Sequence, residues 1–273
     1  MTLSRADIHD LLGSRGLAPQ RALGQNFVAD PNTVRRIARL AEVGPGDHVV
    51  EIGPGLGSLT LALAESGAEV TAIEVDAGIV PILREVVADA TTPVRIVEAD
   101  ATELGWVDVL DPHDDWTLVA NPPYNVATPL VCDVLDGVPQ VRSMIVMVQR
   151  EVAERFVAAP GSKAYGAVSV KIAYWASSAI VARVPSTVFV PRPNVESAIV
   201  RIVRHTPPAV DARRLFDLVR IAFAHRRKML RRTLGDVVDD ATFERAGIDP
   251  ERRPETLSLE EWCRLVDAEV TPS

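Results

Sequence analysis

The residues Asn-Pro-Pro-Tyr at positions 121 to 124 directly follow the apolar run Trp116–Ala120, and their types suit the handling of an amino group on a planar base. The lone pair of such a nitrogen is delocalised into the ring, so a site has to act on it through geometry. The amide oxygen of Asn121 and the main-chain carbonyl of Pro122 could accept its two hydrogens and aim the lone pair at an electrophilic methyl group. Tyr124 could stack on the base, and the prolines would hold the carbonyl still. The alternative is a rigid turn with a packed tyrosine.

A glycine turn follows the predicted strand at residues 48–52. Gly53, Gly55 and Gly57 let the backbone turn sharply and let a ligand approach closely, and the N-terminus of the following helix offers unpaired N–H groups. A dinucleotide fingerprint would have another glycine where Ser58 stands, which disfavours a pyrophosphate ligand. A glycine after a strand is also common in plain turns.

Acidic or amide side chains end the next three predicted strands, at Glu74, Asp100 and Asn121. A carboxylate about 20 residues after a glycine turn can accept both hydroxyl hydrogens of a ribose, which suits either NAD or S-adenosylmethionine. Asp100 could accept a hydrogen from an adenine amino group, although each of these side chains could instead cap the next helix. Ligands of open α/β sheets bind at the carboxyl ends of the strands. We therefore expect Gly53, Glu74, Asp100 and Asn121 to line one crevice for a nucleoside-like cofactor.

The elements that must position these residues alternate between strands and helices from about residue 47. We expect strands at HVVEI, AEVTAIEV, VRIVEA and TLVA, and helices at residues 58–65, 79–88 and 129–135. This alternation predicts a mostly parallel sheet with helices on both faces, the α/β class. The later segments RSMIVMVQ, GAVSVKIAYWA and ESAIVRIV are predicted to continue the strands.

The chain changes character after the segment HTPPAV at residues 205–210. From Asp211 onward the pattern is helical and shows no further strand. We therefore predict one domain at residues 1–205, which includes an N-terminal helical extension at 1–46, and a small helical domain at 206–273.

The composition is that of a soluble globular protein of 273 residues with 47% hydrophobic content. The apolar runs are too short to span a bilayer, and the N-terminus has no signal-peptide pattern, so we expect no membrane association and a cytoplasmic location. Cys132 and Cys263 lie far apart without a nearby Cys/His cluster, so we expect no disulfide framework and no metal. Nothing in the sequence requires more than a monomer.

The net charge is −8, but positive charge is concentrated in two clusters. The first, predicted to lie within a single helical stretch, is a candidate phosphate track and contains Arg226, Arg227, Lys228, Arg231 and Arg232. The second contains Arg15, Arg21, Arg35, Arg36 and Arg39. Either cluster could instead be a solvated face, paired in the first case with acids such as Asp236 and Asp239. His225 is expected to belong to the basic surface.

Seven segments together resemble the small-subunit (16S) ribosomal RNA adenine dimethyltransferases, and the resemblance covers nearly the whole chain. The segments are RALGQNFVADPN (21–32), EIGPGLGSLT (51–60), AIEVD (72–76), NPPYNVATP (121–129), GSKAYGAVSV (161–170), FVPRPNVESAIV (189–200) and FAHRRKMLRRTL (223–234). The GQNF, NPPYN and FxPxPxVxSA motifs also occur in macrolide-resistance methyltransferases of large-subunit RNA. The YG and FxxRRKxL segments favour the small-subunit family.

This resemblance implies a Rossmann-like methyltransferase sheet with a small C-terminal all-helical domain. It also implies that S-adenosylmethionine provides two methyl groups for N6 of each of two adjacent adenosines in the 3′-terminal hairpin loop of small-subunit rRNA during ribosome assembly. The cofactor contacts it implies are Asn26, Val28, Gly53, Glu74, Asp100 and Asn121. The adenine contacts it implies are Asn121, Pro122, Tyr124 and, on the second face of the base, Phe189.

The chain departs from the family pattern at two positions. Pro122 stands where leucine is usual, which brings the motif closer to that of DNA adenine methyltransferases, and Ala99 stands where glycine is usual. Neither change removes a side-chain ligand.

Three other functions are compatible with parts of the pattern. The alternatives are a large-subunit rRNA dimethyltransferase, a non-catalytic assembly or binding protein on the same fold, and a nicotinamide oxidoreductase. The arginine-rich segment after Phe223 argues against the first, and intact Glu74, Asn121 and Tyr124 argue against the second. Ser58 and the absence of hydride-transfer partners argue against the third.

Overall fold

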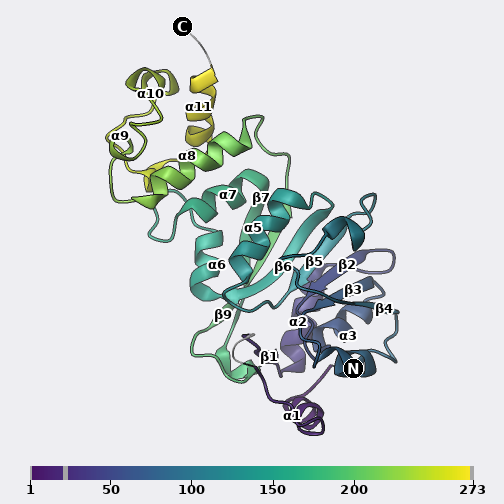
Figure 1. The fold of residues 1–273 in the computed structure, drawn as a ribbon. Helices are drawn as coiled ribbons and strands as arrows, with labels where there is room; N and C mark the ends of the chain where they lie inside the picture. Colours follow the sequence, from purple (N-terminus) through teal and green to yellow (C-terminus); the bar gives the residue numbers. More distant parts are fainter. Residues whose placement is uncertain (1, 21–23, 271–273) are drawn as a thin grey trace. The chain divides into compact units, whose positions relative to one another are not determined.

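The computed structural model describes residues 2–20 and 24–270, and it divides into two compact units (Figure 1). Unit 1 comprises residues 1–153 and 179–203, and unit 2 comprises residues 154–178 and 204–273. The sequence placed a single boundary near residue 206. In the structure, residues 154–178 also cluster with the helical C-terminal part of the chain.

Unit 1 is built around a mixed sheet, which in the described part of the chain has seven strands in the order β4-β3-β2-β5-β6-β9-β7. Neighbours from β4 to β6 run parallel, and β9 is antiparallel to β6. Because β3 and β4 lie on one side of β2 while β5 and β6 lie on the other, the strand order reverses at β2. The strands are β2 (His48–Ile52), β3 (Glu69–Glu74), β4 (Val94–Glu98), β5 (Trp116–Ala120), β6 (Val141–Gln149), β7 (Ala176–Val184) and β9 (Ser197–Arg204).

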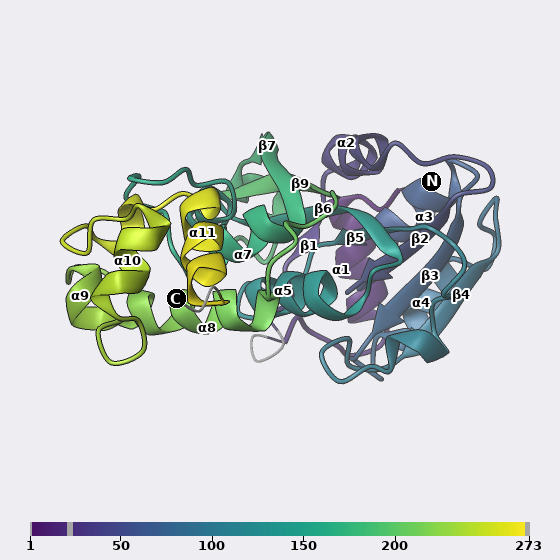
Figure 2. The ribbon, with the colours of Figure 1, turned by 90° about the horizontal axis from the view of Figure 1, so that it is seen from above.

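Helices cover both faces of this sheet, because its strands are apolar on both sides. Figure 2 shows α2 and α5 on opposite faces of β5 and β6. The α2 helix begins where Asp30 accepts a hydrogen bond from the Thr33 N–H (2.9 Å), and it buries Val34 and Ile37 in the sheet core. The helices are α1 (Arg5–Gly13), α2 (Pro31–Ala41), α3 (Ser58–Ala64), α4 (Val80–Val86) and α5 (Ala127–Gly137).

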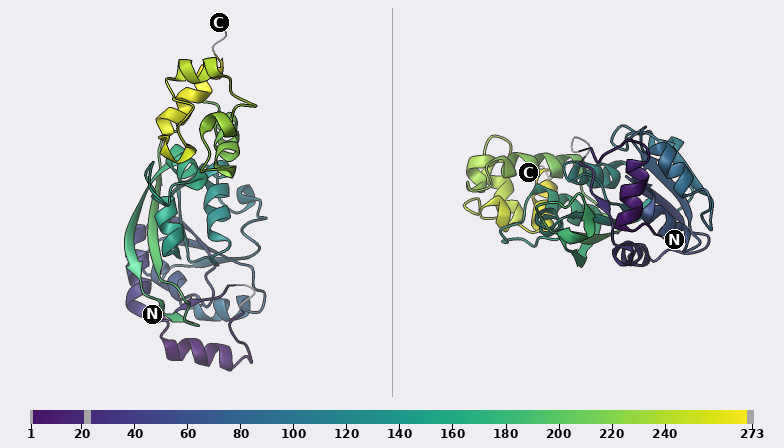
Figure 3. Two further views of the ribbon diagram at one scale, coloured as in Figure 1. Left: turned by 90° about the vertical axis from the view of Figure 1, so that its left-hand side faces the viewer. Right: turned by 90° about the horizontal axis from the view of Figure 1, so that it is seen from below.

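The N-terminal helix α1 packs beside the sheet rather than on it, as the purple helix in Figure 3 shows. Ile8 and Leu12 join a small apolar cluster with Leu56 and Ile82. β1 (Phe27–Val28) forms a short antiparallel pair with β8 (Phe189–Val190). Phe27 and Val190 of this pair belong to the same apolar cluster. The pair joins the QNF segment to the FVPRPN segment, which are far apart in the sequence.

Unit 2 is helical, and its core is built around the completely buried Trp262. Tyr165 donates a hydrogen bond to the Leu257 carbonyl (2.8 Å), and Arg214 forms an ion pair with Glu269 (2.5 Å). The helices are α7 (Ala167–Trp175), α8 (Ala212–Ala224), α9 (Leu230–Thr233), α10 (Asp240–Ala246) and α11 (Leu259–Val270), and α6 (Arg150–Phe156) spans the point where the chain enters unit 2. Short 3₁₀ turns occupy Trp106–Asp108, Ser186–Val188 and Pro254–Thr256. Among the described residues, no helix combines the length and apolarity needed to cross a membrane.

Two sequence-based predictions about elements are wrong. The segment GAVSVKIAYWA forms the helix α7 and not a strand, and the strand in this region is β7, which follows it. The β-branched residues of α7 favoured a strand, but the helix buries Val170 and Ile172 and packs against α8 and α11, so tertiary packing decides. The basic segment is also not one helix: α8 ends at Ala224, and Arg226, Arg227 and Lys228 lie in the turn before α9.

Candidate active site

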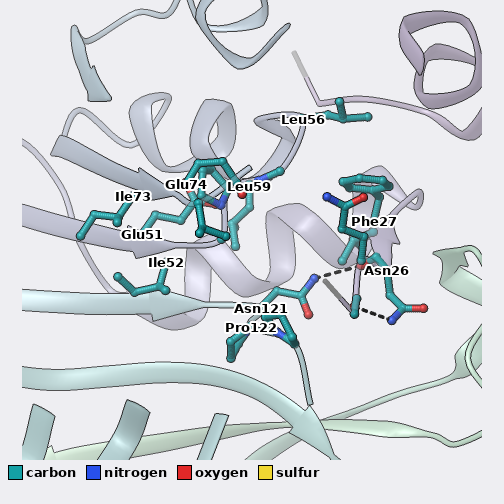
Figure 4. A pocket seen from close by; sticks show the side chains of 18 of the residues that line it. Asn26, Phe27, Glu51, Ile52, Leu56, Leu59, Ile73, Glu74, Asn121 and Pro122 are labelled. Atoms are coloured by element: carbon teal, nitrogen blue, oxygen red, sulfur yellow. Dashed lines mark hydrogen bonds between the residues drawn. The ribbon is translucent and has the colours of Figure 1, made fainter. Parts of the chain in front are cut away.

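A pocket of about 330 Å³ lies in unit 1 at the carboxyl ends of β2, β3, β4 and β5. This is the edge at which the strand order reverses, where ligands of open α/β sheets bind. Eight sequence-predicted site residues line it, and Figure 4 shows several of them: Asn26, Val28, Gly53, Glu74, Asp100, Asn121, Pro122 and Tyr124. The structure therefore brings the four strand-end positions together, as the sequence led us to expect.

The glycine turn forms the floor of this pocket. Gly53, Gly55 and Gly57 all have positive φ, at 70°, 55° and 87°, a conformation that other residues rarely adopt. At Gly55 a Cβ would also lie 2.8 Å from the Phe27 ring, so the turn and the β1 segment are in close contact. The turn thus needs glycine both for its conformation and for its packing.

Glu74 ends β3 and is held by main-chain hydrogen bonds. Its Oε2 accepts from the Gly55 N–H (3.0 Å) and its Oε1 from the Asp76 N–H (2.9 Å). Burial raises the pKa of this carboxyl, while the two N–H bonds oppose that rise. Each oxygen keeps a second lone pair, so the carboxylate can still accept hydroxyl hydrogens from a ligand.

Glu51, on the neighbouring strand β2, is a buried carboxyl that the sequence analysis did not assign. Its side chain is 1% exposed, it lines the pocket, and its Oε2 has no hydrogen-bond partner among the described residues. Burial raises its pKa to about 8; the Thr60 hydroxyl opposes this rise, and the charge of Glu74 adds to it. Glu51 therefore holds a proton at neutral pH, next to the Glu74 carboxyl (Figure 4).

The Asn121 amide is oriented by the main chain of another segment. Its Nδ2 donates to the carbonyl oxygen of Asn26 (3.2 Å), shown by a dashed line in Figure 4. The Asn26 side chain donates in turn to the Gly24 carbonyl (2.9 Å), and a Cβ on Gly24 would lie 2.8 Å from the Cβ of Pro123. Because a carbonyl can only accept, it fixes which end of the Asn121 amide is nitrogen, and the Oδ1 atom remains for a ligand.

Tyr124 is held at its hydroxyl end. The oxygen lies 3.0 Å from the Ser197 hydroxyl, at the start of β9, and the half-buried ring lines the pocket. Ser197 is itself buried, so the tyrosine has a rigid partner. The arrangement fixes the ring at its hydroxyl end, while the residue lines the pocket.

Phe189 does not lie where the sequence placed it. Its side chain is completely buried among core residues such as Val34 and Ile199, and it does not line the pocket. The physical reason is that Phe189 belongs to β8, whose pairing with β1 directs the ring into the core. In this conformation it offers no face to a base.

Asp100 and Val28 take part in local structure as well as lining the pocket. Asp100 is exposed, and its Oδ1 accepts from both the N–H (2.8 Å) and the hydroxyl (2.7 Å) of Thr102. Val28 is 8% exposed and belongs to the sheet core. Asp100 therefore does not cap a helix, because the residues that follow it form a turn, and its bonds to Thr102 are compatible with a place at the pocket.

A family comparison identifies the chain. The profile of the family described as "Ribosomal RNA adenine dimethylase" matches residues 17–269. The chain belongs to this family. A relative from Cutibacterium acnes named "Ribosomal RNA small subunit methyltransferase A" is 46% identical over 282 residues, covering 97% of this chain and 94% of the relative. The family predicted from the sequence motifs is confirmed.

Solved structures confirm the predicted methyltransferase fold. A crystal structure of the 23S rRNA methyltransferase ErmE matches with a TM-score of 0.70 and 25% identity, covering 89% of this chain and 98% of that one. A dimethyladenosine transferase from Plasmodium falciparum matches with a TM-score of 0.76 and 22% identity, covering 86% of this chain and 94% of that one. The chain therefore has the fold of an rRNA adenine dimethyltransferase.

The first basic cluster lies on the surface of unit 2, and its charges differ in their surroundings. Arg226 pairs with Glu255 (3.2 Å) and Arg231 with Glu251 (3.0 Å). In the described part of the chain, Arg227 and Lys228 form no ion pair, and both are exposed. The acids that partner this cluster are thus on the segment before α11 and not, as the sequence suggested, at Asp236 and Asp239.

The second basic cluster is dispersed over unit 1. Arg35, Arg36 and Arg39 lie on the exposed face of α2, whereas Arg15 forms an ion pair with Glu85. Arg21 lies outside the described residues. Of this cluster, the described residues that share one exposed helix face are therefore Arg35, Arg36 and Arg39.

Sequence reasoning missed several residues that hold the site. These are Gln25 and Phe27 beside the glycine turn, Glu51 in β2, Asp76 after β3 and Ser197 in β9. All five lie inside the motifs that carry the family resemblance, which was the signal available for them. Their roles could not be predicted because their partners are distant in sequence. The pairing of β1 with β8 could not be inferred from two two-residue strands.

Proposed function

We propose that this chain transfers methyl groups from S-adenosylmethionine to N6 of two adjacent adenosines in the 3′-terminal hairpin loop of small-subunit rRNA, and that it does so in the cytoplasm. Family membership and the 46% identity to a relative named for small-subunit methylation support the substrate class. The observation that carries the chemistry is the Asn121 amide, held by the Asn26 carbonyl at the pocket that contains Glu74.

The pocket residues fit S-adenosylmethionine. Glu74, fixed by two main-chain N–H groups, would accept the ribose hydroxyl hydrogens, and the positive-φ turn at Gly53 would let the cofactor lie close to the backbone. Asp100 would accept from the adenine amino group, and the main chain at Asn26 and Val28 would border the other side. The bound cofactor supplies an electrophilic methyl group on a sulfonium.

The target nitrogen would be activated by position. Asn121 Oδ1 and the carbonyl of Pro122 would accept the two amino hydrogens, which draws the nitrogen toward tetrahedral geometry and directs its lone pair at the methyl carbon. The cofactor would supply the methyl group for this lone pair, and the nitrogen held by the two acceptors would then release a proton to water. Tyr124, fixed at Ser197, would hold the base by stacking on one face.

The same geometry suits the second methyl group. After the first transfer the nitrogen carries one hydrogen, and one of the two acceptors is sufficient to orient it. Pro122 is buried and its ring fixes the backbone, so its carbonyl keeps its direction between the two transfers. This supports dimethylation by a single site.

The decisive experiment measures methyl transfer from labelled S-adenosylmethionine to undermethylated small subunits and, separately, to protein-free large-subunit rRNA, followed by digestion to nucleosides. We expect N6,N6-dimethyladenosine from the small subunit alone. Label in large-subunit rRNA would instead assign the activity for which the ErmE structure is named. Cofactor binding without label in either RNA would favour a binding or assembly role.

The variant Asn121→Ala tests the role of the amide. We expect methyl transfer to fall at least a thousandfold, because the amide both binds and orients the reacting nitrogen, while thermal stability changes little at this half-buried position. Asn32→Ala, which removes an exposed amide on α2, is the matched control and should keep full activity. A stably folded, fully active Asn121→Ala variant would contradict the proposal.

We also propose that the basic turn of unit 2 (Arg226, Arg227 and Lys228), together with Arg231 in α9, contacts RNA phosphates. The double variant Arg227→Ala/Lys228→Ala should weaken RNA binding and reduce the slope of log affinity against log salt by about 2, because two phosphate contacts are lost. Cofactor affinity should not change. The control Arg213→Ala/Arg220→Ala removes two exposed charges from α8. Equal slopes in the two double variants would show that the turn is an ordinary solvated surface.

A further inference from the structure

Asp76, which follows β3, connects the cofactor side of the pocket to the segment that orients Asn121. Its side chain is 8% exposed, and its Oδ2 accepts from the side-chain amides of Gln25 (2.7 Å) and Gln20 (3.0 Å). Its Oδ1 accepts from the Gly78 N–H (2.9 Å). A carboxylate has enough lone pairs for all three donors, which an amide or hydroxyl in this position would not have.

The two glutamines are also joined to each other. The Gln20 N–H donates to the Gln25 side-chain oxygen (2.8 Å), and the Gln25 N–H donates to the Gln20 carbonyl (3.3 Å). Gln25 thus has its amide nitrogen fixed by Asp76 and its amide oxygen fixed by Gln20. Its position in the pocket lining is determined by contacts with Gln20 in its own segment and with Asp76 after β3.

The residue after Gln25 is the one that orients the candidate catalytic amide. The Asn26 carbonyl accepts from Asn121 Nδ2 at 3.2 Å, a distance at which a small displacement of the carbonyl weakens the bond considerably. An asparagine amide that loses this partner can rotate, and the rotated form would point two donors at an amino group that needs acceptors. The direction of the Asn121 amide therefore depends on where Gln25 is held.

We propose that Asp76 is a positioning residue for methyl transfer: through Gln25 it fixes the Asn26 carbonyl, so that Asn121 presents its oxygen to the target nitrogen. The inference rests on the proposed function of Asn121. The Asp76 main-chain N–H, which binds Glu74, remains in any side-chain variant. Loss of the carboxylate should therefore affect kcat much more than the affinity for the cofactor.

The test is a pair of substitutions with reversed hydrogen-bond polarity. In Asp76→Asn the new amide oxygen can still accept from Gly78, but the new NH₂ group faces the NH₂ group of Gln25. In Gln25→Glu two carboxylates face each other. In the double variant Asp76→Asn/Gln25→Glu, the NH₂ group introduced at position 76 can donate to the carboxylate introduced at position 25. That carboxylate also accepts from the Gln20 N–H, so the connection between positions 76 and 25 is restored, although the Gln20 side-chain amide loses its acceptor at position 76.

We expect kcat to fall roughly tenfold in each single variant, with the cofactor Kd unchanged within about twofold, and to recover to within about threefold of the wild type in the double variant. Asp111→Asn is the matched control, because the Asp111 carboxylate accepts from a main-chain N–H two residues on (His113, 2.9 Å), as Asp76 does from Gly78. It should be fully active. Unchanged kcat in both single variants, or a double variant no better than either single one, would overturn the proposal.

A second measurement separates this inference from the proposed function. The Asn121 side-chain NH₂ resonances, assigned by their loss in Asn121→Ala, report the bond to Asn26 in the protein without RNA. We expect their chemical shifts and protection from exchange to change in each single variant and to return in the double variant. Unaltered resonances in Asp76→Asn would refute the positioning role even if the wild type proved inactive on rRNA. Altered resonances with an inactive wild type would refute the proposed function alone.

Discussion

The proton on Glu51 makes a prediction that can be tested without substrate or cofactor. Burial raises the pKa of this carboxyl from 4.5 to about 8. Between these values the folded protein keeps a proton that the unfolded chain releases, so the free energy of unfolding must fall as the pH rises. Glu51→Gln replaces the carboxyl with an uncharged group of the same shape and removes this dependence.

The expected size follows from the two pKa values. One pKa unit corresponds to about 1.4 kcal/mol, and the stabilising proton is almost fully bound at pH 5 and half bound at pH 8. The wild type should therefore lose roughly 3 kcal/mol of stability from this group between pH 5 and pH 8, a loss that Glu51→Gln does not share. The difference in unfolding free energy between Glu51→Gln and the wild type should therefore shift in favour of the variant by this amount between pH 5 and pH 8.

The assay must report on unit 1, because the chain divides into two compact units and proteins with several units often depart from two-state unfolding. Protein without cofactor is equilibrated in urea at pH 5, 6, 7 and 8, pulsed briefly with deuterium at one common pH, and analysed by mass spectrometry of peptides from β2 and β3. Glu103→Gln, an exposed glutamate with the same change of charge, is the control. If the wild type, Glu103→Gln and Glu51→Gln share one pH dependence, then Glu51 is ionised in the folded protein and the argument from burial is wrong.

Two further predictions concern the turn and the tyrosine. Gly55→Ala should raise the Kd for S-adenosylmethionine at least tenfold, measured by calorimetry, because the added Cβ would lie 2.8 Å from the Phe27 ring. The control is Gly46→Ala, where φ is also positive (90°) but no atom lies within 4 Å of the added Cβ. This variant should leave the Kd unchanged. Tyr124→Phe should lower kcat only a few-fold, because the ring remains while the hydrogen bond to Ser197 is lost. Tyr124→Ala removes the ring and should lower kcat at least a hundredfold. Equal losses in the two variants would show that the hydroxyl and not the ring matters.

The convergence of the strand ends could be predicted from the sequence because it depends on local patterns. Each of the parallel strands is a short apolar run followed by a turn or a polar residue, and the carboxyl ends of parallel strands meet at one edge of a sheet. Gly53, Glu74, Asp100 and Asn121 line one pocket for this reason. No knowledge of distant contacts was needed.

The secondary-structure prediction was wrong where tertiary packing overrides local conformational preference. The segment that forms α7 is rich in valine and isoleucine, which favour strands, yet it is helical because α8 and α11 cover its apolar side. The basic segment has a continuous helical pattern, yet the chain turns between Ala224 and Leu230. There Leu230 donates its N–H to the Arg252 carbonyl (2.8 Å), a contact with a distant segment that no local pattern contains.

Phe189 and Asn26 show why positions in the β1 and β8 segments could not be predicted as well as the glycine turn and the strand ends. Both positions lie in the antiparallel pair of β1 and β8 or directly before it, and this pair joins segments about 160 residues apart in the chain. The pairing turns the Phe189 ring into the core, and the Asn26 carbonyl, directly before β1, accepts from the Asn121 amide. A side chain's type can indicate what it could bind, but its direction here is set by a partner strand of two residues. The orientation of the Asn121 amide therefore depends on long-range hydrogen bonds, and substitutions at Gln25 and Asp76 should affect it even though neither residue needs to touch the RNA.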